Sequence, residues 1–322
     1  MFTRFLSLLW LTGVGMASAL TEYATTDEAL SAAREQKRAV MVDFTGTDWC
    51  PACIHLRHQI IDTPAFEQAL GNQLVLVSVD FPRTPALREK ITPKQWEERE
   101  EMLRSYGIEG LPAVVLMDAE GLPFALIQGA RRTAGDYIPL VQEALKLREA
   151  RDAALAEADR LTGMERARAL VKALELLPEI CRDKYHALIE EINRLDTDNS
   201  LGYRDLVKLS ERRVQQLKAF RELTRTFVGK FKPEELHKTI EQLDAFLAQE
   251  DLLPEIRQQA LAAKADSYAF LGDFRKQLDT LKKALEATLG KDVSASEATL
   301  TRAERKLRTN IEHLEKNVIP RL

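Results

Sequence analysis

Residues 43–53 read DFTGTDWCPAC and place two cysteines, Cys50 and Cys53, at the end of an apolar run. Residues 39–42, AVMV, predict a buried β-strand, and apolar residues after Cys53 recur at near-helical spacing. The cysteines therefore stand where a strand gives way to a helix. Free backbone N–H groups and the positive end of the helix dipole stabilise a thiolate there, and cysteine pKa values at such positions fall to about 3.5–7.5. Cys50 is the predicted nucleophile, and Cys53, one helical turn further, is the predicted resolving thiol.

Two other interpretations fit a pair of cysteines at this spacing, namely half of a zinc site and a static disulfide. His55 and His58 follow closely and are of the type that binds zinc. Structural zinc sites usually take their second pair of ligands from a separate segment, which favours solvated histidines on a helix face instead. No metal or other cofactor is therefore expected.

A second motif follows at residues 105–116, SYGIEGLPAVVL, which read as a helix end, a glycine turn, a Leu-Pro dipeptide and a strand. The hairpin turn DAEG at 118–121 and a strand that closes at Gly129 come next. In this order the two motifs resemble the thioredoxin superfamily, whose members carry Trp-Cys-x-x-Cys and then Tyr-Gly-Ile-x-Gly-x-Pro, with a cis proline, before a β-hairpin. The resemblance covers residues 24 to about 148.

The resemblance implies an α/β thioredoxin-like fold, in which a central mixed sheet has helices on both faces. It also implies a thiol-disulfide oxidoreductase that exchanges disulfides with proteins through Cys50 and Cys53. Pro112 would be the cis proline beside the disulfide, and Trp49 and the backbone of Leu111 would contact a bound peptide. The partners expected are protein thiols or disulfides, together with a redox partner protein.

The sequence departs from thioredoxin itself around this motif. Pro51-Ala52 replaces Gly-Pro between the cysteines, and the spacing from Asp43 to Cys50 is one residue longer than in thioredoxin. Residues 45–49, TGTDW, look more like secreted, thioredoxin-like proteins of the disulfide-reductase group. Asp43 still falls where the family keeps a buried carboxylate that helps to move the proton of the resolving thiol. A polar residue at a strand end is the alternative. Between Asp80 and Tyr106 a longer charged segment replaces the family's short link, and it reads either as a substrate-facing lid or as an added helix.

Residues 1–19 have the pattern of a secretory signal peptide. Arg4 precedes an apolar stretch that ends at Ala17-Ser18-Ala19, a small-x-small cleavage site. The apolar core is shorter than the roughly 20 residues of a transmembrane helix, so we expect a periplasmic or secreted protein without a membrane span after cleavage. With only 3 cysteines in 322 residues, disulfides cannot staple such a scaffold, and chemistry explains the pair at 50 and 53 better.

Composition limits the partners further. The chain has 46 Lys plus Arg against 50 Asp plus Glu and a net charge of -4, so no basic excess is present to bind phosphate backbones. Nucleic acid is therefore not an expected ligand. The content of 45% hydrophobic and 30% charged residues is that of a globular chain, whose length suggests two domains.

From Asp136 onward glycine nearly vanishes and apolar residues recur at helical spacing. We expect a signal peptide at 1–19, a thioredoxin-like domain at 20–148 and an α-helical domain of about seven or eight helices at 149–322. The expected helix breaks are Gly163, Pro178, residues 196–200, Pro233, Pro254 and Gly272. Residues 269–286, and more weakly 161–175, resemble tetratricopeptide hairpins, and an irregular bundle is the alternative.

The helical half carries the third cysteine, Cys181, which is expected to be a buried small hydrophobic residue. The alternative function is a partner-binding helical scaffold for which the thioredoxin-like domain is a carrier. The intact dithiol favours the enzyme, because a carrier has no need of one. The sequence leaves open whether the enzyme reduces, oxidises or isomerises disulfides, and which oligomeric state it adopts.

Overall fold

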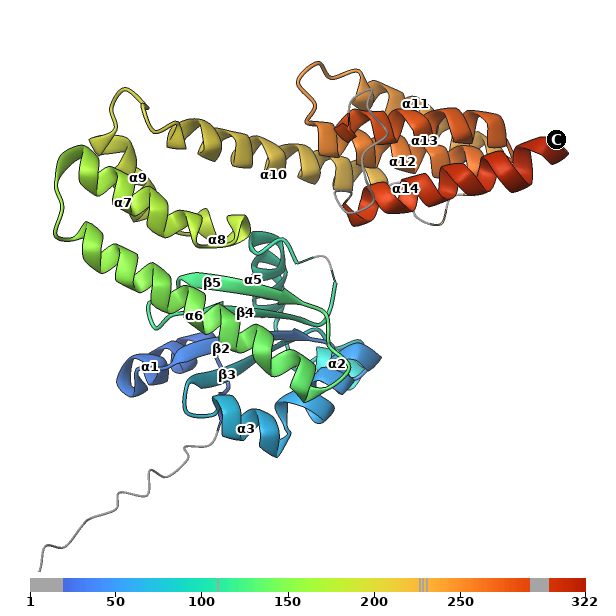
Figure 1. Ribbon diagram of the computed structural model, residues 1–322. Coiled ribbons are helices and arrows are strands. Elements are labelled where there is room, and N and C mark those ends of the chain that lie inside the picture. Colours follow the sequence, from blue (N-terminus) through green and yellow to red (C-terminus); the bar gives the residue numbers. More distant parts are fainter. Residues whose placement is uncertain (1–19, 109, 226, 228, 230, 290–300) are drawn as a thin grey trace, which may run out of the picture. The chain divides into compact units, whose positions relative to one another are not determined.

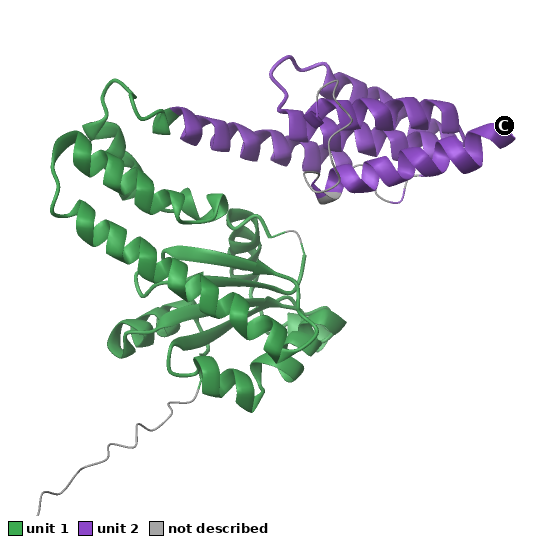
Figure 2. Ribbon diagram, in the orientation of Figure 1, with its two compact units in different colours: residues 1–204 green, residues 205–322 purple. Residues whose placement is uncertain are grey.

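The computed structural model describes residues 20–289 and 301–322, apart from residues 109, 226, 228 and 230. The chain divides into two compact units, Met1–Arg204 and Asp205–Leu322 (Figures 1 and 2). The signal peptide expected at 1–19 lies outside the described residues. The domain end expected at residue 148 falls inside helix α6, Ala134–Ala158, and the first compact unit continues beyond that helix.

A mixed five-stranded sheet in the order β1-β3-β2-β4-β5 forms the centre of the first unit. Its strands are β1 Thr21–Tyr23, β2 Ala39–Thr45, β3 Leu74–Asp80, β4 Ala113–Met117 and β5 Pro123–Gln128. Strand β3 runs parallel to β1 and β2, whereas β4 runs antiparallel to β2 and β5. Strands β2 and β4 are buried along their whole length, as continuous apolar runs covered on both faces should be. This confirms the expected thioredoxin-like sheet.

Helices cover both faces of this sheet. On one face α1 (Thr26–Gln36) and α5 (Pro93–Ser105) pack in an apolar cluster with Val40, Val42 and Phe44 of β2. Because side chains alternate along a strand, Met41 and Asp43 point to the opposite face. Figure 1 shows α6 lying across the sheet, near α2 (Pro51–Leu56) and α3 (Pro64–Leu70). The π-helical turn η1, Arg57–Ile61, continues directly from α2.

Threonines begin several helices, as the local sequence requires. In a capping box the threonine hydroxyl accepts from the backbone N–H three residues on, and the side chain there accepts in return from the threonine N–H. Helices α1, α5, α6 and α14 (Arg302–His313) have such boxes at Thr25, Thr92, Thr133 and Thr301. These boxes fix where the four helices start, three of which flank the sheet.

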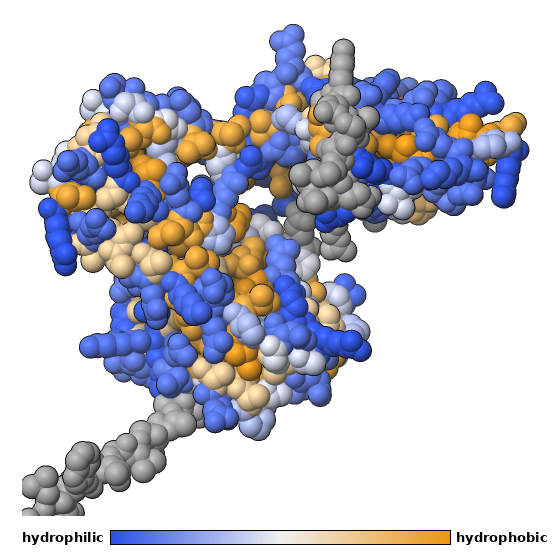
Figure 3. Space-filling model, viewed as in Figure 1, coloured by the Kyte–Doolittle hydropathy of each residue, from blue (hydrophilic) through white to orange (hydrophobic). Residues whose placement is uncertain are grey.

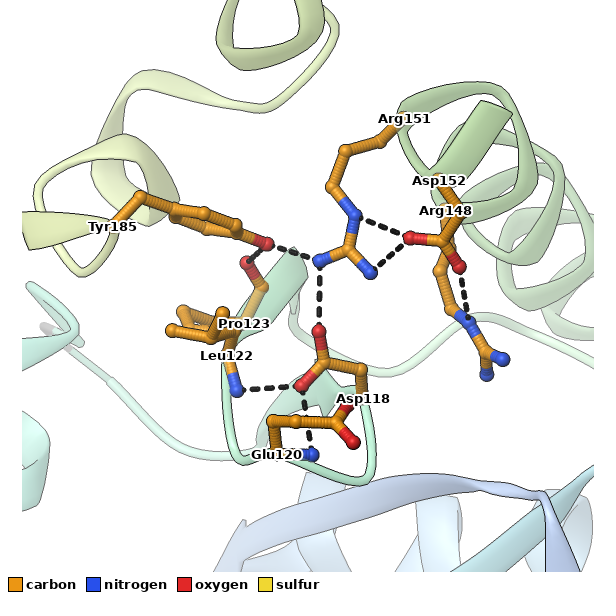
Figure 4. A network of polar contacts seen from close by, with 8 residues as sticks. All are labelled: Asp118, Glu120, Leu122, Pro123, Arg148, Arg151, Asp152 and Tyr185. Atoms are coloured by element: carbon orange, nitrogen blue, oxygen red, sulfur yellow. Dashed lines mark hydrogen bonds and ion pairs between the residues drawn. The ribbon is translucent and has the colours of Figure 1, made fainter. Parts of the chain in front are cut away.

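After α6 the first unit continues as α7 (Gly163–Glu175), α8 (Glu179–Arg182) and α9 (His186–Leu195). A buried polar network joins α6 and the residue before α9 to the hairpin between β4 and β5 (Figure 4). Arg151 of α6 donates to the Asp118 carboxylate at 2.9 Å and also to the hydroxyl of Tyr185, which itself donates to the carbonyl of Pro123 at 3.1 Å. The part of α6 beyond residue 148 and the start of α9 are thereby bonded to the sheet domain itself.

The second unit is helical throughout its described residues. Helix α10 (Tyr203–Arg225) leads to α11 (Pro233–Leu247), α12 (Pro254–Phe270), α13 (Phe274–Leu289) and α14, followed by the short turns η2 (Leu314–Val318) and η3 (Ile319–Arg321). Every expected break falls at a helix end: α7 starts at Gly163, α8 is preceded by Pro178, α9 ends before residues 196–200, and α11 and α12 start at Pro233 and Pro254.

Helices α12 and α13 form the hairpin that the sequence predicted around Gly272, whose φ of 74° is the left-handed conformation that glycine adopts readily. This confirms an all-α C-terminal region, and its tetratricopeptide character stays a prediction. On the face seen in Figure 3, hydrophilic and apolar residues are interspersed over the first unit, and apolar residues also show between the helices of the second unit. Among the described residues, none of the helices combines the length and the hydropathy that a membrane crossing requires.

Candidate active site

The two cysteines lie at the start of α2, where the sequence placed them. Cys50 is the N-cap residue, Pro51 occupies the first helical position, and Cys50 and Cys53 are joined by a disulfide. The backbone N–H of Cys53 points at the sulfur of Cys50, 3.2 Å away. Cys50 retains 5% of its surface exposed and Cys53 only 1%, so the sulfur of Cys50 is the more accessible of the two.

The loop before β4 lies opposite the disulfide. The carbonyl oxygen of Leu111 is 3.9 Å from the sulfur of Cys50, and the Leu111-Pro112 peptide bond is cis. The carbonyl of Pro112 in turn accepts from the N–H of Gly129 at 2.8 Å, which ties the loop to the end of β5. The structure thus brings together four residues that the sequence predicted for one site, from two segments about 60 positions apart.

Residues 46–49, between β2 and the disulfide, are bonded to the end of β3 and to the chain that follows it. Thr47 donates its backbone N–H and its hydroxyl to the two carboxylate oxygens of Asp80, at 2.9 and 2.8 Å. The indole N–H of Trp49 donates to the carbonyl of Phe81 at 2.7 Å. A side chain at Gly46 would meet the Trp49 ring at 2.7 Å, so only glycine fits beneath it.

Asp48 adds further bonds to the same chain segment. Its carboxylate accepts the backbone N–H groups of Arg83 at 3.1 Å and of Thr84 at 2.6 Å. The guanidinium of Arg83 lies over the Trp49 ring, 3.5 Å from its centroid. Sequence reasoning missed Thr47, Asp48 and Arg83, because nothing in residues 43–53 reveals which distant segment their polar atoms will meet.

The charged segment between β3 and Tyr106 contains two helices, α4 (Pro85–Arg88) and α5. Trp96 of α5 packs edge-on against Phe81, with ring centroids 5.6 Å apart, and belongs to the apolar cluster on that face of the sheet. Arg99 donates to the backbone carbonyl of Asp80 at 2.5 Å. The segment therefore contains an added helix that packs on the sheet, and its substrate-facing role stays a prediction.

Asp43 lies in the middle of β2 and is only 1% exposed. Its Oδ1 atom has no hydrogen-bond partner among the described residues, and burial raises the pKa of this carboxyl to about 7. The hydroxyl of Tyr137, at the start of α6, is also buried and has no hydrogen-bond partner within the described structure. Burial and the nearby Asp43 charge raise the pKa of this tyrosine. Asp43 is thus a buried group that titrates near neutral pH.

Neither histidine near the disulfide has the surroundings of a metal ligand. A ring nitrogen of His55 bonds to the carbonyl of Arg131 at 3.0 Å, and His58 pairs with Asp62 four residues on. Within the described ranges no group of three or more His, Cys, Asp or Glu side chains could hold a metal ion. Cys50 and Cys53, which would have to supply thiolates, are bonded to each other.

Cys181 is the third cysteine and lies buried in α8, not bonded to another cysteine. Burial raises the pKa of its thiol to about 12, so it stays protonated at neutral pH. This is the environment of a small apolar residue, as the sequence predicted, and the opposite of that of a nucleophile.

Comparison with known proteins agrees with this geometry. The family model of the thioredoxin-like domain matches residues 26–144. The disulfide bond reductase DsbH of Chlamydia pneumoniae is 32% identical over 133 residues, which are 41% of this chain and 78% of that protein. The thioredoxin-related protein DsbJ of the same organism is 26% identical over 94 residues, 29% of this chain and 26% of that protein. A solved structure titled DsbH oxidoreductase is 28% identical, with a TM-score of 0.36, and the match covers 45% of this chain and 96% of that one.

Proposed function

This chain belongs to the thioredoxin-like family, and on that premise we propose that it is a thiol-disulfide oxidoreductase acting on proteins outside the cytoplasm. The observation that carries the proposal is the disulfide between Cys50 and Cys53 at the start of α2, with the Leu111 carbonyl 3.9 Å from the outer sulfur. A carrier domain would need neither feature. The pattern of residues 1–19 supports a periplasmic or secreted location.

The reaction begins from the reduced enzyme. The Cys50 thiolate attacks one sulfur of a substrate disulfide and forms a mixed disulfide, and the other substrate sulfur leaves as a thiolate that takes up a proton. Cys53 then loses its proton and attacks the Cys50 sulfur, which releases the second substrate thiolate and forms the disulfide seen here. The Cys53 N–H, 3.2 Å from the Cys50 sulfur, stabilises negative charge on that atom before the attack.

The surrounding residues supply positioning and proton transfer. The Leu111 carbonyl faces the outer sulfur and accepts a backbone N–H of the bound peptide, while Pro112 shapes that loop and Trp49 forms an adjacent wall. Asp43, with a pKa of about 7, accepts the Cys53 proton when the mixed disulfide is resolved. A base that titrates near the working pH is well matched to such a transfer. The similarity to a protein named as a disulfide bond reductase favours the reducing direction.

Substitution of the cysteines tests the assignment. Cys50→Ser should abolish the reduction of insulin disulfides, whereas Cys181→Ser should retain it, because the thiol of Cys181 is buried and protonated. Cys53→Ala should accumulate mixed disulfides on Cys50, and the trapped proteins can be identified by mass spectrometry. Equal loss of activity in the Cys50 and Cys181 variants would refute the assignment. The reduction potential of the pair, measured against glutathione, then fixes the direction of exchange.

A further inference from the structure

A pocket of about 500 Å³ lies between the segment after β3 and helix α5. Its lining residues are Arg83, Pro85, Arg88, Glu89, Ile91, Pro93 and Trp96. Its volume lies in the range of about 300–1,000 Å³ that is typical of ligand sites. None of these residues belongs to the disulfide or to the Leu111 loop, so the site described above leaves the pocket without a role.

The pocket is held in a fixed position beside the disulfide. Its first residue, Arg83, stacks on Trp49, the residue directly before Cys50. Asp48 accepts the backbone N–H groups of Arg83 and Thr84, so the start of the pocket segment is bonded to the loop that carries the nucleophile. The pocket is therefore joined, through Trp49 and Asp48, to the loop at which a polypeptide must bind for its disulfide to reach Cys50.

Two guanidinium groups give the pocket its chemistry. Arg83 lies over Trp49 at 3.5 Å and Arg88 over Trp96 at 3.7 Å, each measured to the ring centroid. Stacking occupies the flat face of a guanidinium and leaves the N–H groups at its edge free to bind a carboxylate in the same plane. In the described part of the chain neither guanidinium forms an ion pair, although other arginines of this unit, such as Arg57 and Arg151, do.

One opposing charge lies among the lining residues. Glu89 carries a carboxylate next to Arg88 and reduces the positive potential of the pocket. Three other acids nearby are already engaged. Asp48 and Asp80 accept from backbone N–H groups and from Thr47, and Glu100 accepts the indole N–H of Trp96 and pairs with Arg104. The pocket therefore combines two oriented cations and one anion with an apolar wall of two prolines, an isoleucine and an indole.

We propose that the pocket binds an acidic side chain, Asp or Glu, of the polypeptide whose disulfide is exchanged at Cys50. The inference rests on the proposed function and names the substrate class of the same site: proteins that carry a carboxylate near the reacting cysteine. A carboxylate bridging the edges of Arg83 and Arg88 forms charge-assisted hydrogen bonds, and the methylene groups of its side chain contact the apolar wall.

The test compares two synthetic peptides with the same disulfide, one carrying Glu near the cysteine and the other carrying Gln at that position. With the full-length reduced enzyme, we expect kcat/KM to be about fivefold higher for the Glu peptide at low salt, the scale of a partly exposed ion pair. The preference should shrink in 0.5 M salt, at which charges are screened beyond roughly 4 Å. Equal values for the two peptides at low salt would overturn the proposal.

Three variants locate the effect. Arg88→Gln should lower the Glu-to-Gln ratio towards one, whereas Glu89→Gln should raise it, because the two substitutions change the pocket charge in opposite directions. Lys146→Gln, an exposed residue of α6 outside the pocket, removes the same charge as Arg88→Gln and should leave the ratio unchanged. An unchanged ratio in both pocket variants overturns the proposal even if the wild-type enzyme prefers Glu. If the wild-type enzyme exchanges neither peptide nor insulin, the proposed function itself fails, which is distinct from exchange without a preference.

Discussion

Two buried carboxylates in the first unit have opposite surroundings. Asp118, in the turn after β4, is 6% exposed and accepts hydrogen bonds from the N–H groups of Glu120 and Leu122 and from the Arg151 guanidinium (Figure 4). Asp43, in β2, is 1% exposed and leaves Oδ1 without a partner in the described structure. Burial alone therefore does not decide what a carboxylate does, since its partners determine which protonation state the fold favours.

The proton-transfer role proposed for Asp43 accounts for the difference. A buried carboxylate ordinarily needs a charge partner and hydrogen bonds, and Asp118 has both. A proton acceptor must instead be able to change charge near neutral pH, and the burial of Asp43 raises its pKa into that range. The missing partner of Asp43 is thus a cost to stability that the proposed chemistry explains.

The largest effect is expected when Asp118, the carboxylate with its partners in place, loses Arg151. Arg151→Ala would leave Asp118 buried with its charge uncompensated, and we expect the free energy of unfolding of the first unit to fall by about 3–5 kcal/mol. Urea denaturation followed by circular dichroism measures this loss. The double variant Asp118→Asn/Arg151→Met removes both charges and should recover much of it. A loss below about 1 kcal/mol in Arg151→Ala would show that the network contributes no more than a surface ion pair.

The second prediction concerns Asp43, the carboxylate whose Oδ1 has no partner in the described structure. Its substitution should raise the free energy of unfolding instead of lowering it. Asp43 has a pKa of about 7 in the folded protein against 3.8 for the ordinary carboxyl, so the folded state binds more protons between these values. Stability should therefore fall as the pH rises from about 4 to 7. Asp43→Asn stays neutral and avoids this loss, so the variant should exceed the wild type by about 2–4 kcal/mol at pH 8 and match it near pH 4. Denaturation at the two pH values measures the difference, and a variant less stable than the wild type at pH 8 would contradict it.

The same substitution should slow catalysis. Because Asp43 is the proposed acceptor of the Cys53 proton, resolution of the mixed disulfide in Asp43→Asn should be slower by about 10- to 100-fold at pH 7. Stopped-flow measurement of mixed-disulfide decay isolates this step from the first attack by Cys50. The gap should narrow as the pH falls below the Asp43 pKa of about 7, because the wild-type carboxyl is then protonated as well. If the ratio of the two resolution rates stayed constant across pH 5–8, the slower resolution in Asp43→Asn would result from altered packing and not from the loss of a proton acceptor.

The sequence predicted the elements of the sheet domain better than their polar connections. The strand predicted at 39–42 lies within β2, and the strands predicted on either side of the 118–121 turn are β4 and β5, because each is an apolar run bounded by turn residues. The three-residue β1, TEY, has no apolar run, and its pairing with β3 is a tertiary contact that no local pattern reveals. Proline and glycine likewise marked the helix ends, since both act within a few residues of their position.

In the site, as in the fold, the local motifs were predictable from the sequence and the tertiary polar contacts were not. Cys50, Cys53 and the Leu111-Pro112 loop form recognisable local motifs, and the structure brings them together. The partners of Asp43 and Asp118 were not predictable, because both are single acids after or within apolar strands. The two acids differ in their tertiary surroundings. Asp118 is bonded to Arg151, which lies 33 positions further along the chain, whereas the buried hydroxyl of Tyr137 near Asp43 forms no hydrogen bond in the described structure.

Two buried tyrosines, one near each carboxylate, differ in the same way as the carboxylates do. Their substitution should have the smallest effect on the free energy of unfolding. Tyr137 and Tyr185 are 0% and 2% exposed, and each belongs to one of the two carboxylate regions. The hydroxyl of Tyr185 accepts from Arg151 and donates to the Pro123 carbonyl, whereas the hydroxyl of Tyr137 has no partner among the described residues. The same change, tyrosine to phenylalanine, removes one oxygen atom from each region.

Tyr185→Phe should lower the free energy of unfolding by about 1–2 kcal/mol, because it leaves the Pro123 carbonyl and one guanidinium N–H without their partner. Tyr137→Phe should change it by less than about 1 kcal/mol or raise it, because a buried hydroxyl without a partner stabilises nothing. Urea denaturation of both variants at pH 7 measures the pair under one set of conditions. If Tyr137→Phe destabilises the protein as much as Tyr185→Phe, the Tyr137 hydroxyl has a hydrogen-bond partner in solution. A water shared with Asp43 would be that partner, and the apparent pKa of Asp43 would then rise in the same variant, because a hydrogen bond that favours the carboxylate would be lost.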